Sequence, residues 1–462
     1  MSSPIETLPA ELFLGVVKHL RRHDMTQLMR VSTQYNKLME PILWSKIELH
    51  RYWFHEHYTF RSLRAEEAAS QRPYHQPAGI SSWEELMRGT ANKDRTIETL
   101  DIGQGKTADY FLKVFPGKTT EPRGERIERL ATVVRWLCLP VHISYVGDYA
   151  SESRNRGPWN AVAMFKNLEY LEISAYWRDR DEVEPFEAPD EPMSNLKTLK
   201  LRGHVPLEFV QYMCANASII THLQLAVIDN PIGASNRTTR KNPPPPLDSD
   251  DEDAQGFEDE ENVAPRPLAC LTPQILSNFS ALEELYLCRP AEGAYDGEDA
   301  YCEVYTSKKS DRKVLQEWAA LLRGSRETLA RITFDQRIVA EENAPDGRTS
   351  SEMMDGYCNG DGYKRFVEIV LPVLMEDGEW PALKSIRLFG FEVEDAANRE
   401  RSVNLVAKFQ KRFGEGVEIL NGVGRWMLID DDTGELQGRT PGDILDTYPD
   451  SESGDSDDDT AQ

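Results

Sequence analysis

The feature that most constrains the fold is a short apolar pattern that returns along most of the chain. In each copy three positions are apolar. The second lies three positions after the first, and the third lies two positions after the second. The last two apolar residues alternate with a polar one, as a β-strand with one buried face requires. The copies are Ile97-Leu100-Ile102, Val134-Leu137-Leu139, Leu168-Leu171-Ile173, Leu196-Leu199-Leu201, Ile220-Leu223-Leu225, Leu282-Leu285-Leu287, Leu329-Ile332-Phe334 and Leu383-Ile386-Leu388. Such repetition predicts an array of similar strands.

Segments with helical periodicity lie between these strands, and the clearest begin at Leu207, Pro273, Lys313 and Gly362. Strand and helix therefore alternate, which predicts an α/β fold. The strand pattern resembles that of leucine-rich repeats, and the resemblance implies a solenoid. The copies are 24 to 62 residues apart, whereas regular repeats are roughly 20–29 residues long. We therefore expect an irregular leucine-rich-repeat solenoid with long insertions.

Charge and proline content predict where the chain does not fold. The net charge is −25; residues 242–262 hold nine acidic and no basic residues, and residues 443–462 hold eight and none. Segments this polar cannot bury enough surface to fold, so we predict a disordered insertion and a disordered tail. The expected organisation is a helical module at 1–50, a helical connector at 51–96, the first half of the array at 97–241, the insertion at 242–267, the second half at 268–440 and the tail at 441–462.

The end of the second half has its own pattern. A helix is expected at about Ser402 to Phe413, followed by a hairpin-like pair formed by Val417 to Leu420 and Trp426 to Ile429. These elements are expected to cap the array, because a terminal repeat must cover its apolar face.

The N-terminal module is predicted to contain three short helices. Apolar residues from Leu12 to Leu20 recur at steps of three and four, which predicts a helix from about Pro9 to Leu20. Asp24 is expected to cap a second helix, and Ser32 a third that Pro41 ends. Three such helices in about forty residues make a small core, so the module is expected to need a partner surface.

This module resembles the F-box, which docks onto the small adaptor subunit of cullin-RING ubiquitin ligases. The matching residues are Leu8-Pro9, Glu11-Leu12, Val16, Leu20, Asp24, Leu28, Val31-Ser32 and Pro41-Ile42-Leu43-Trp44. Tyr35 stands where the family usually has Trp, and Met25 where Leu is common. The resemblance implies binding to the ligase adaptor, and through it to cullin, by Leu8, Pro9, Glu11, Leu12, Val16, Leu28, Val31 and Tyr35. The alternative is an ordinary helical hairpin that begins with Leu-Pro.

An F-box followed by irregular repeats resembles the substrate-receptor subunits of such ligases, particularly divergent ones from filamentous fungi. The resemblance implies a protein without an active site that holds a target close to the ubiquitin-charged enzyme. One alternative is a scaffold with no role in ubiquitin transfer. Another is an enzyme, either cysteine-dependent or a nucleotide hydrolase acting through Gly103 to Thr107, although Leu100 occupies the position of the first glycine in a phosphate-binding loop.

The polar residues that alternate with the buried ones are the candidate target site. They are Tyr170, Glu172, Thr198, Lys200, Arg202, His222, Gln224, Glu284, Tyr286, Arg331, Thr333, Ser385, Arg387 and Phe389. Arginine can hold a carboxylate or a phosphate through two hydrogen bonds. We therefore assign Lys200, Arg202, Tyr286, Arg331 and Arg387 to the binding of an acidic or phosphorylated protein target. The alternative is a solvated strand face without a ligand.

Other classes of function have little support in the sequence. No basic run is present, so nucleic acid is not an expected partner. No apolar run is long enough for a membrane span, and we expect a cytoplasmic or nuclear protein. The six cysteines form no CxxC pair, so we expect neither a metal site nor disulfides, and we assign no cofactor and no catalytic residue. Ser249 and Ser456 precede acidic runs and are candidate phosphorylation sites.

Overall fold

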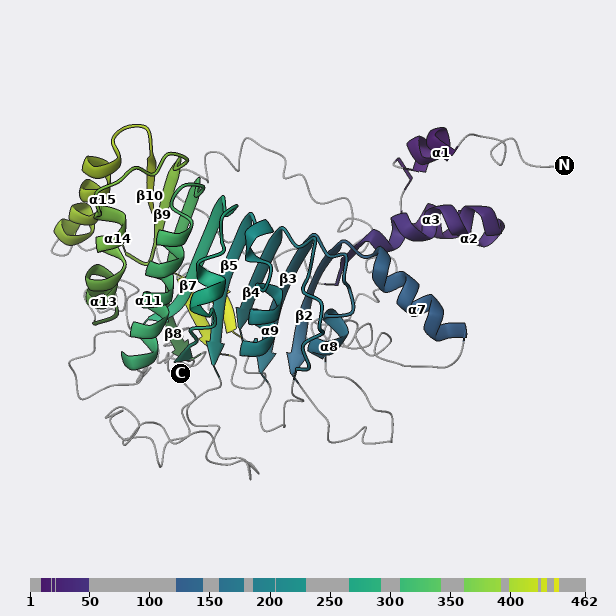
Figure 1. The fold of residues 1–462 in the computed structure, drawn as a ribbon, viewed down its shortest axis with the longest axis horizontal. Helices are drawn as coiled ribbons and strands as arrows, with labels where there is room; N and C mark the ends of the chain where they lie inside the picture. The colour runs from purple at the N-terminus through teal and green to yellow at the C-terminus, as the bar shows by residue number, and fades with distance from the viewer. Residues whose placement is uncertain are drawn as a thin grey trace, which may run out of the picture.

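The chain forms one α/β assembly around a largely parallel β-sheet (Figure 1). The computed structural model describes residues 10–17, 19–20, 22–49, 122–143, 158–177, 186–203, 205–229, 266–291, 308–341, 361–391, 399–422, 425–429 and 436–439. The predicted connector, the copy at Ile97-Leu100-Ile102, the Gly103 to Thr107 loop, most of the acidic insertion and the acidic tail lie outside these residues.

The strands lie side by side in chain order. They are β1 (Lys46–Glu48), β2 (Trp136–Ile143), β3 (Tyr170–Trp177), β4 (Thr198–Gly203), β5 (His222–Asp229), β7 (Glu284–Ala291), β8 (Arg331–Glu341), β9 (Ser385–Phe389) and β10 (Glu418–Gly422). Each pairs in parallel with the next. The other seven copies of the apolar pattern coincide with β2 to β5 and β7 to β9, so the predicted α/β alternation is confirmed.

A repeated backbone hydrogen bond joins successive units just before their strands. The carbonyl of Glu169 accepts from the N–H groups of Lys197 and Thr198, at 2.9 and 3.0 Å. The carbonyl of Lys197 accepts in the same way from Thr221 and His222, at 2.8 and 3.1 Å. The carbonyls of Arg135, Thr221, Glu283 and Ala330 each bind the equivalent pair of N–H groups in the following unit. The units therefore share one geometry although the segments between them differ in length.

Helices cover one face of the sheet. They are α7 (Pro122–Val133), α8 (Pro158–Val162), α9 (Leu207–Met213), α10 (Pro273–Leu276), α11 (Lys308–Gly324), α13 (Asp361–Ile369), α14 (Leu371–Met375) and α15 (Arg399–Phe413). Figure 1 shows α8, α9 and α11 in front of the strands. On this side Phe334 of β8 packs against Phe366 of α13, with ring centroids 5.2 Å apart, and against Trp318 of α11. The apolar residues of the repeated pattern are buried here, and their polar neighbours lie on the opposite side, which we call the polar face.

The N-terminal unit consists of α1 (Ala10–Val17), α2 (Arg22–Val31) and α3 (Thr33–Ser45). It lies at one end of the sheet, opposite α15 and β10 (Figure 1). Helix α3 leads directly into β1, and the carboxylate of Glu40 in α3 accepts a hydrogen bond from Arg129 in α7 at 2.7 Å. The unit is therefore joined to the sheet by a strand and an ion pair.

Two details of this unit differ from the sequence expectation. Asp24 was expected to be the N-cap of the second helix. Helix α2 begins at Arg22, so Asp24 lies within its first turn. Helix α3 has Ser32 as its N-cap, with the hydroxyl accepting from the Gln34 N–H at 3.2 Å, as predicted, but it continues through Pro41. Ile42 and Trp44 are partly buried beyond the proline, and this packing offsets the hydrogen bond that proline removes.

The C-terminal strands correct the predicted hairpin. Strand β10 pairs in parallel with β9, whereas β11 (Arg425–Ile429) pairs in parallel with the second half of β8. The two strands expected to pair with each other therefore extend different parts of the sheet, because β8 is long enough to hold β9 along its first half and β11 along its second. Strand β12 (Leu436–Arg439) pairs antiparallel with β11.

The last two residues of the predicted insertion, 242–267, form a strand. Arg266 and Pro267 form β6, which pairs antiparallel with the end of β5. Just beyond it, the carboxylate of Glu317 in α11 accepts the Leu271 N–H at 2.6 Å and lies 3.8 Å from the Cys270 thiol. Burial raises the pKa of Glu317 to about 7. This contact fixes the chain where it re-enters the array.

A buried ionic cluster holds the second half of the array together. Asp311 of α11 is fully buried and pairs with Arg289 of β7 and, at 2.5 Å, with Arg365 of α13. Arg289 also donates to Gln336 of β8 at 2.6 Å and to the Gly362 carbonyl at 2.8 Å. These contacts link strands β7 and β8 to helices α11 and α13.

Candidate partner-binding sites

The polar face carries aligned rows of side chains because the parallel strands are in register. One row contains His222, Glu284, Arg331 and Ser385; the next contains Lys200, Gln224, Tyr286, Thr333 and Arg387. In a strand, successive side chains point to opposite faces, so residues two apart share a face. The sequence expectation that these residues lie together on one face is confirmed by the pairing.

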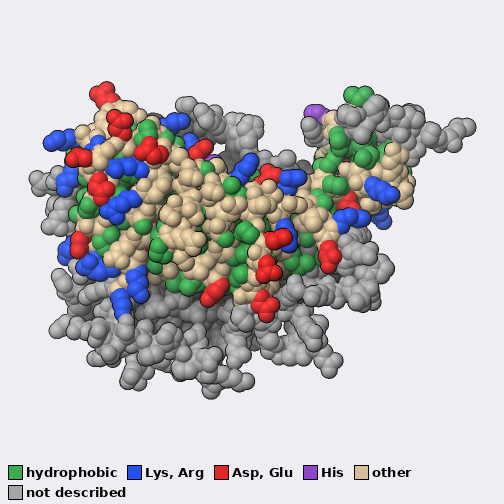
Figure 2. Space-filling view, viewed as in Figure 1, with side chains coloured by type: hydrophobic (Ala, Val, Ile, Leu, Met, Phe, Trp, Pro, Cys, Tyr) green, Lys and Arg blue, Asp and Glu red, His purple; other side chains and the backbone are tan. Residues whose placement is uncertain are grey.

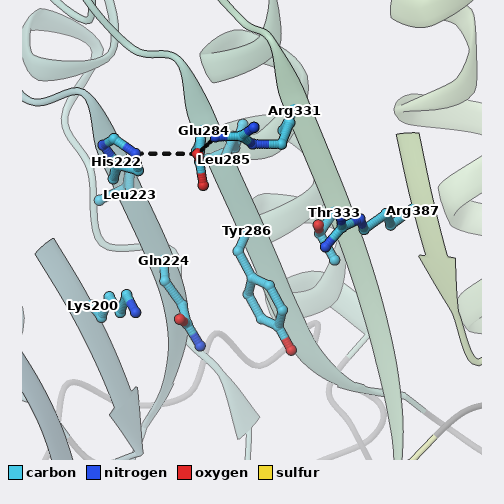
Figure 3. Close-up of a pocket in the computed structure, with 10 residues that line it drawn as sticks. All are labelled: Lys200, His222, Leu223, Gln224, Glu284, Leu285, Tyr286, Arg331, Thr333 and Arg387. Atoms are coloured by element: carbon cyan, nitrogen blue, oxygen red, sulfur yellow. Dashed lines mark ion pairs between the residues drawn. The ribbon is translucent and has the colours of Figure 1, made fainter. Parts of the chain in front are cut away.

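A pocket of about 350 Å³ opens on this face. It is lined by Lys200, His222, Leu223, Gln224, Glu284, Leu285, Tyr286, Arg331, Thr333 and Arg387. Figure 3 shows Lys200 on one side, Arg331 and Arg387 on the other, and Gln224 and Tyr286 between them. Four of the five residues that the sequence assigned to target binding, namely Lys200, Tyr286, Arg331 and Arg387, therefore line one pocket.

A chain of polar contacts crosses the upper part of this pocket. Glu284 pairs with Arg331 and lies 3.2 Å from Nε2 of His222. The other ring nitrogen of His222, Nδ1, is 2.8 Å from the Thr221 hydroxyl. Burial lowers the pKa of His222; the negative charge of Glu283 opposes this shift, and the positive charges of Arg331 and Lys200 add to it. His222 is therefore neutral near pH 7 and acts as a hydrogen-bonding group toward Glu284.

Arg387 differs from the other two cations of the pocket. Lys200 has a carboxylate partner, since its Nζ is 3.5 Å from Glu172, and Arg331 has Glu284. Among the residues that the structure describes, Arg387 makes no ion pair, and its Nε is buried without a hydrogen-bond partner. Its charge is the least compensated in the pocket.

Arg202 does not line the pocket, although it shares the carboxylate of Glu172 with Lys200. It is 5% exposed, and its guanidinium lies 3.1 Å from the carboxylate of Glu172. The Tyr170 hydroxyl donates to the same carboxylate, and burial followed by this negative charge raises the pKa of Tyr170. The assignment of Arg202 to target binding is therefore not supported, because burial and pairing with Glu172 give it a role within the sheet.

The N-terminal unit carries a second candidate surface. In the part of the chain that the structure describes, the exposed large hydrophobic side chains are Leu12, Val16 and Val31, at 59%, 52% and 77%. Leu12 and Val16 are four residues apart and share a face of α1. Figure 2 shows hydrophobic atoms at the surface of this unit, whereas acidic and basic side chains are interspersed over the opposite end of the molecule.

The internal contacts of the unit explain why these residues remain outside. Phe13, Val17, Tyr35 and Met39 form its buried cluster, with Phe13 and Tyr35 stacked at 5.1 Å between ring centroids. Phe13 and Val17 follow Leu12 and Val16 by one residue, so α1 has one apolar face turned inward and another exposed. Tyr35, which the sequence placed in the docking surface, packs inside at 4% exposure.

The remaining docking residues occupy varied positions. Leu28 is half-buried against the internal cluster. Glu11 lies in α1, and Leu8 and Pro9 fall outside the described residues. Sequence alone did not separate core from surface in this unit, because Leu12, Phe13, Val16 and Val17 are all apolar.

The described residues contain few features of other kinds of site. No group of three or more His, Cys, Asp or Glu side chains among them can hold a metal ion, and none of their helices is long and apolar enough to cross a membrane. Cys138, Cys214, Cys270 and Cys288 are buried free thiols. No protein-family model matches the chain, and no curated protein matches it.

Proposed function

We propose that this protein is the target-binding subunit of a cullin-RING ubiquitin ligase, with an F-box at α1 to α3 and an irregular leucine-rich-repeat array behind it. The observation that carries the proposal is the arrangement of the N-terminal unit. A unit with so small a core leaves Leu12, Val16 and Val31 exposed, and exposed apolar groups on a small helical module favour a protein partner.

The array supports the same proposal by its geometry. Strands in chain order, helices on one face and a hydrogen bond repeated between units are the features expected of a leucine-rich-repeat array. Its polar face presents a pocket at a distance from the N-terminal unit. A target held there and an adaptor held by α1 would be joined through one connected frame, which raises the effective concentration of target lysines near the ubiquitin-charged enzyme.

The first test is co-purification of the full-length chain with the ligase adaptor subunit. The double variant Leu12→Ala, Val31→Ala is expected to weaken binding by about 50-fold, because it removes roughly 2–3 kcal/mol of apolar burial. Its thermal unfolding is expected to match the wild type, since both side chains are exposed. Lys408→Ala, exposed on α15 at the far end, is the control and is expected to bind normally.

A second measurement separates a ligase subunit from a scaffold. In a ligase reconstituted with adaptor, cullin, RING subunit and conjugating enzyme, the chain is expected to receive ubiquitin on its own lysines, and the double variant is expected to receive much less. Binding to the adaptor without any ubiquitin transfer would favour the scaffold. A folded wild-type chain that does not bind the adaptor would overturn the proposal.

A further inference from the structure

The pocket on the polar face is positively charged, whereas the chain as a whole is acidic. Its lining contains the cations Lys200, Arg331 and Arg387 and one carboxylate, Glu284, while His222 is neutral near pH 7. Three positive charges and one negative charge leave a net charge of +2, in a chain whose net charge is −25. A pocket of this sign attracts the acidic residues of its own chain as well as external ones.

Arg387 has a donor that the described structure leaves unsatisfied. Its Nε is buried without a hydrogen-bond partner, and it makes no ion pair within the described part of the chain. Native proteins keep few buried donors without an acceptor. On the neighbouring strand, Arg331 contacts Glu284, but a guanidinium has five N–H donors and can bind a second acceptor. Both arginines can therefore bind an additional carboxylate.

Two segments of the chain could supply such carboxylates. Residues 450–459, which we call the acidic segment, and residues 250–259 of the insertion each hold six acidic and no basic residues. Both lie outside the described residues. The structure nevertheless defines where the chain leads into each of them, and these positions differ in their relation to the pocket.

The strand before the acidic segment runs toward the pocket. Strand β12 is antiparallel to β11, and its last residue, Arg439, pairs with Trp426, which in turn pairs with Ile338 of β8. Arg387 pairs with Thr333, five residues before Ile338 on the same strand. At about 3.3 Å per residue along a strand and about 4.8 Å between strands, Arg439 and Arg387 are about 20 Å apart. The chain therefore leaves β12 near the pocket and in its direction.

The insertion is attached at a different place. Strand β5 leads away from the pocket, from His222 in the lining to Asp229. The chain returns in β6, where Arg266 pairs with Asp229. Both attachment points of the insertion therefore lie at the end of β5 that is remote from the pocket, so the acidic segment is the better-placed occupant.

The acidic segment is long enough to reach the pocket and to cross it. Asp450 follows Arg439 by eleven residues, which can span up to about 36–40 Å. Lys200 and Arg387 lie in one row of the sheet, four strand spacings apart, or about 19 Å. Asp455 follows Asp450 by five residues, which cover about 17–18 Å when extended. Two carboxylates of the segment thus match the cations on the two sides of the pocket (Figure 3).

We propose that the acidic segment, residues 450–459, docks in the pocket of its own chain, with its carboxylates bound by Lys200, Arg331 and Arg387. The docked segment occupies the surface that an external anionic ligand needs, so the chain blocks its own pocket until the segment is displaced. Attachment to the same chain gives the segment an effective concentration in about the millimolar range. The docking involves the array alone and does not depend on the proposed function.

A peptide competition tests the docking. The probe is fluorescein-labelled TYPDSESGDSDDDT, the sequence of residues 447–460, and fluorescence anisotropy measures its binding to full-length chains. The neutral-segment variant carries Asp450→Asn, Glu452→Gln, Asp455→Asn, Asp457→Asn, Asp458→Asn and Asp459→Asn. The matched control is the neutral-insertion variant, which carries Asp250→Asn, Asp251→Asn, Glu252→Gln, Asp253→Asn, Glu258→Gln and Asp259→Asn.

The probe is expected to bind the neutral-segment variant at least about tenfold more tightly than the wild type, because the wild-type segment competes at a high effective concentration. The neutral-insertion variant is expected to bind the probe as weakly as the wild type does. Both variants lose the same number of negative charges, so the comparison separates docking of the segment from a general reduction of repulsion.

A second substitution tests the pocket. Arg387→Met, added to the neutral-segment variant, keeps the apolar stem of the side chain and removes its donors. It is expected to weaken binding of the probe at least about tenfold, the effect of losing charge-assisted hydrogen bonds, and to leave the unfolding temperature equal or higher. Arg312→Met in the same background is the control, since Arg312 is exposed on α11 and pairs with Glu368. It is expected to bind the probe normally.

Carbodiimide cross-linking of the wild-type chain locates the contact, because it joins a carboxylate to an amine only where the two touch. Mass spectrometry is expected to find an amide between Lys200 and a carboxylate of the acidic segment. In a mixture of ¹⁴N-labelled and ¹⁵N-labelled chains, the two joined peptides are expected to carry the same label.

The inference is overturned if the probe does not bind the neutral-segment variant, if it binds this variant and the wild type equally, or if a folded Arg387→Met variant binds it undiminished. Tighter binding to the neutral-insertion variant alone would assign the pocket to the insertion, and cross-links between differently labelled chains would assign it to a second copy. Either result would also overturn the inference. Every measurement uses the chain without the ligase adaptor, so it can be interpreted whether or not α1 to α3 bind that adaptor.

Discussion

The N-terminal unit and the strand array use the same kinds of apolar residue in opposite ways. In β3 and β4, Leu171, Ile173, Leu199 and Leu201 are completely buried. In α1, Leu12 is 59% exposed and stands directly beside the buried Phe13. The array covers its apolar residues with helices, whereas the N-terminal unit has too few residues to cover its own. Exposure of an apolar residue therefore marks a place where the chain needs a partner.

The charged groups within the array also differ from one another. Within the array, the buried carboxylate of Asp311 pairs with two arginines. The buried carboxylate of Glu172 contacts a lysine, an arginine and a tyrosine. Arg387 lacks such compensation in the described structure. The paired charges hold strands and helices of the array together, whereas Arg387 presents an uncompensated charge to the pocket.

Truncation of a fully packed aromatic residue in the array is expected to have the largest effect. Phe334→Ala removes a side chain that contacts Phe366 and Trp318, and it should lower the free energy of unfolding by about 3–5 kcal/mol through lost burial and a cavity. Urea unfolding, followed by tryptophan fluorescence, measures this loss in the free energy of unfolding. A loss below about 1 kcal/mol would show that this part of the array is loosely packed.

The next effect depends on pH and is confined to the array. The pKa of Glu317 is raised to about 7 from an ordinary value near 4.5, chiefly by burial. Between these values the folded chain holds a proton that the unfolded chain releases, so the free energy of unfolding falls by roughly 3 kcal/mol as the pH rises through this range. The variant Glu317→Gln should lack this decrease in the free energy of unfolding. Urea midpoints at pH 5 and pH 8 measure the difference. The exposed Glu368→Gln is the control, and an unchanged slope in Glu317→Gln would contradict the assignment.

A smaller effect is expected from a helix cap in the N-terminal unit. Ser32→Ala removes the hydroxyl that accepts from the Gln34 N–H, and it should destabilise α3 by about 1 kcal/mol. Hydrogen exchange of the α3 amides measures the change locally, and the amides of α11 should be unaffected. Equal acceleration in both helices would mean that the unit and the array open together.

The smallest effect on stability is expected from an exposed apolar residue. Leu12→Ala should change the free energy of unfolding by less than about 0.5 kcal/mol, because surface substitutions away from packed groups have little effect. The neighbouring Phe13→Ala should cost more than about 2 kcal/mol, since Phe13 is 3% exposed and stacks on Tyr35. Chemical unfolding of the two variants tests the contrast, and similar losses would remove the distinction between core and docking surface.

Several parts of the fold were predictable because their signal is local. The alternation around Leu199 and Leu201 predicted both the strand β4 and the side of the sheet to which Lys200 points. The cap at Ser32 was predictable for the same reason, since a hydroxyl before a helical pattern needs only neighbouring N–H groups. The pocket residues Lys200, Tyr286, Arg331 and Arg387 followed from the same alternation once strands were placed.

Other parts depended on contacts between distant residues. The hairpin expected near Val417 was wrong because β11 finds its partner in the second half of β8, about ninety residues earlier. Pro41 did not end α3 because packing of Ile42 and Trp44 outweighs the local penalty. The burial of Arg202 and its pairing with Glu172 likewise depend on a neighbouring strand.

By itself the sequence determined the strands of the array, the direction of their side chains and the position of the small helical unit, because each is set by spacing along the chain. Tertiary structure alone decided which apolar residues of that unit remain exposed, which strands pair at the C-terminal end and which cations are neutralised. These depend on what lies across space from a residue: Leu12 and Phe13 are equally apolar, and only packing against Tyr35 separates them.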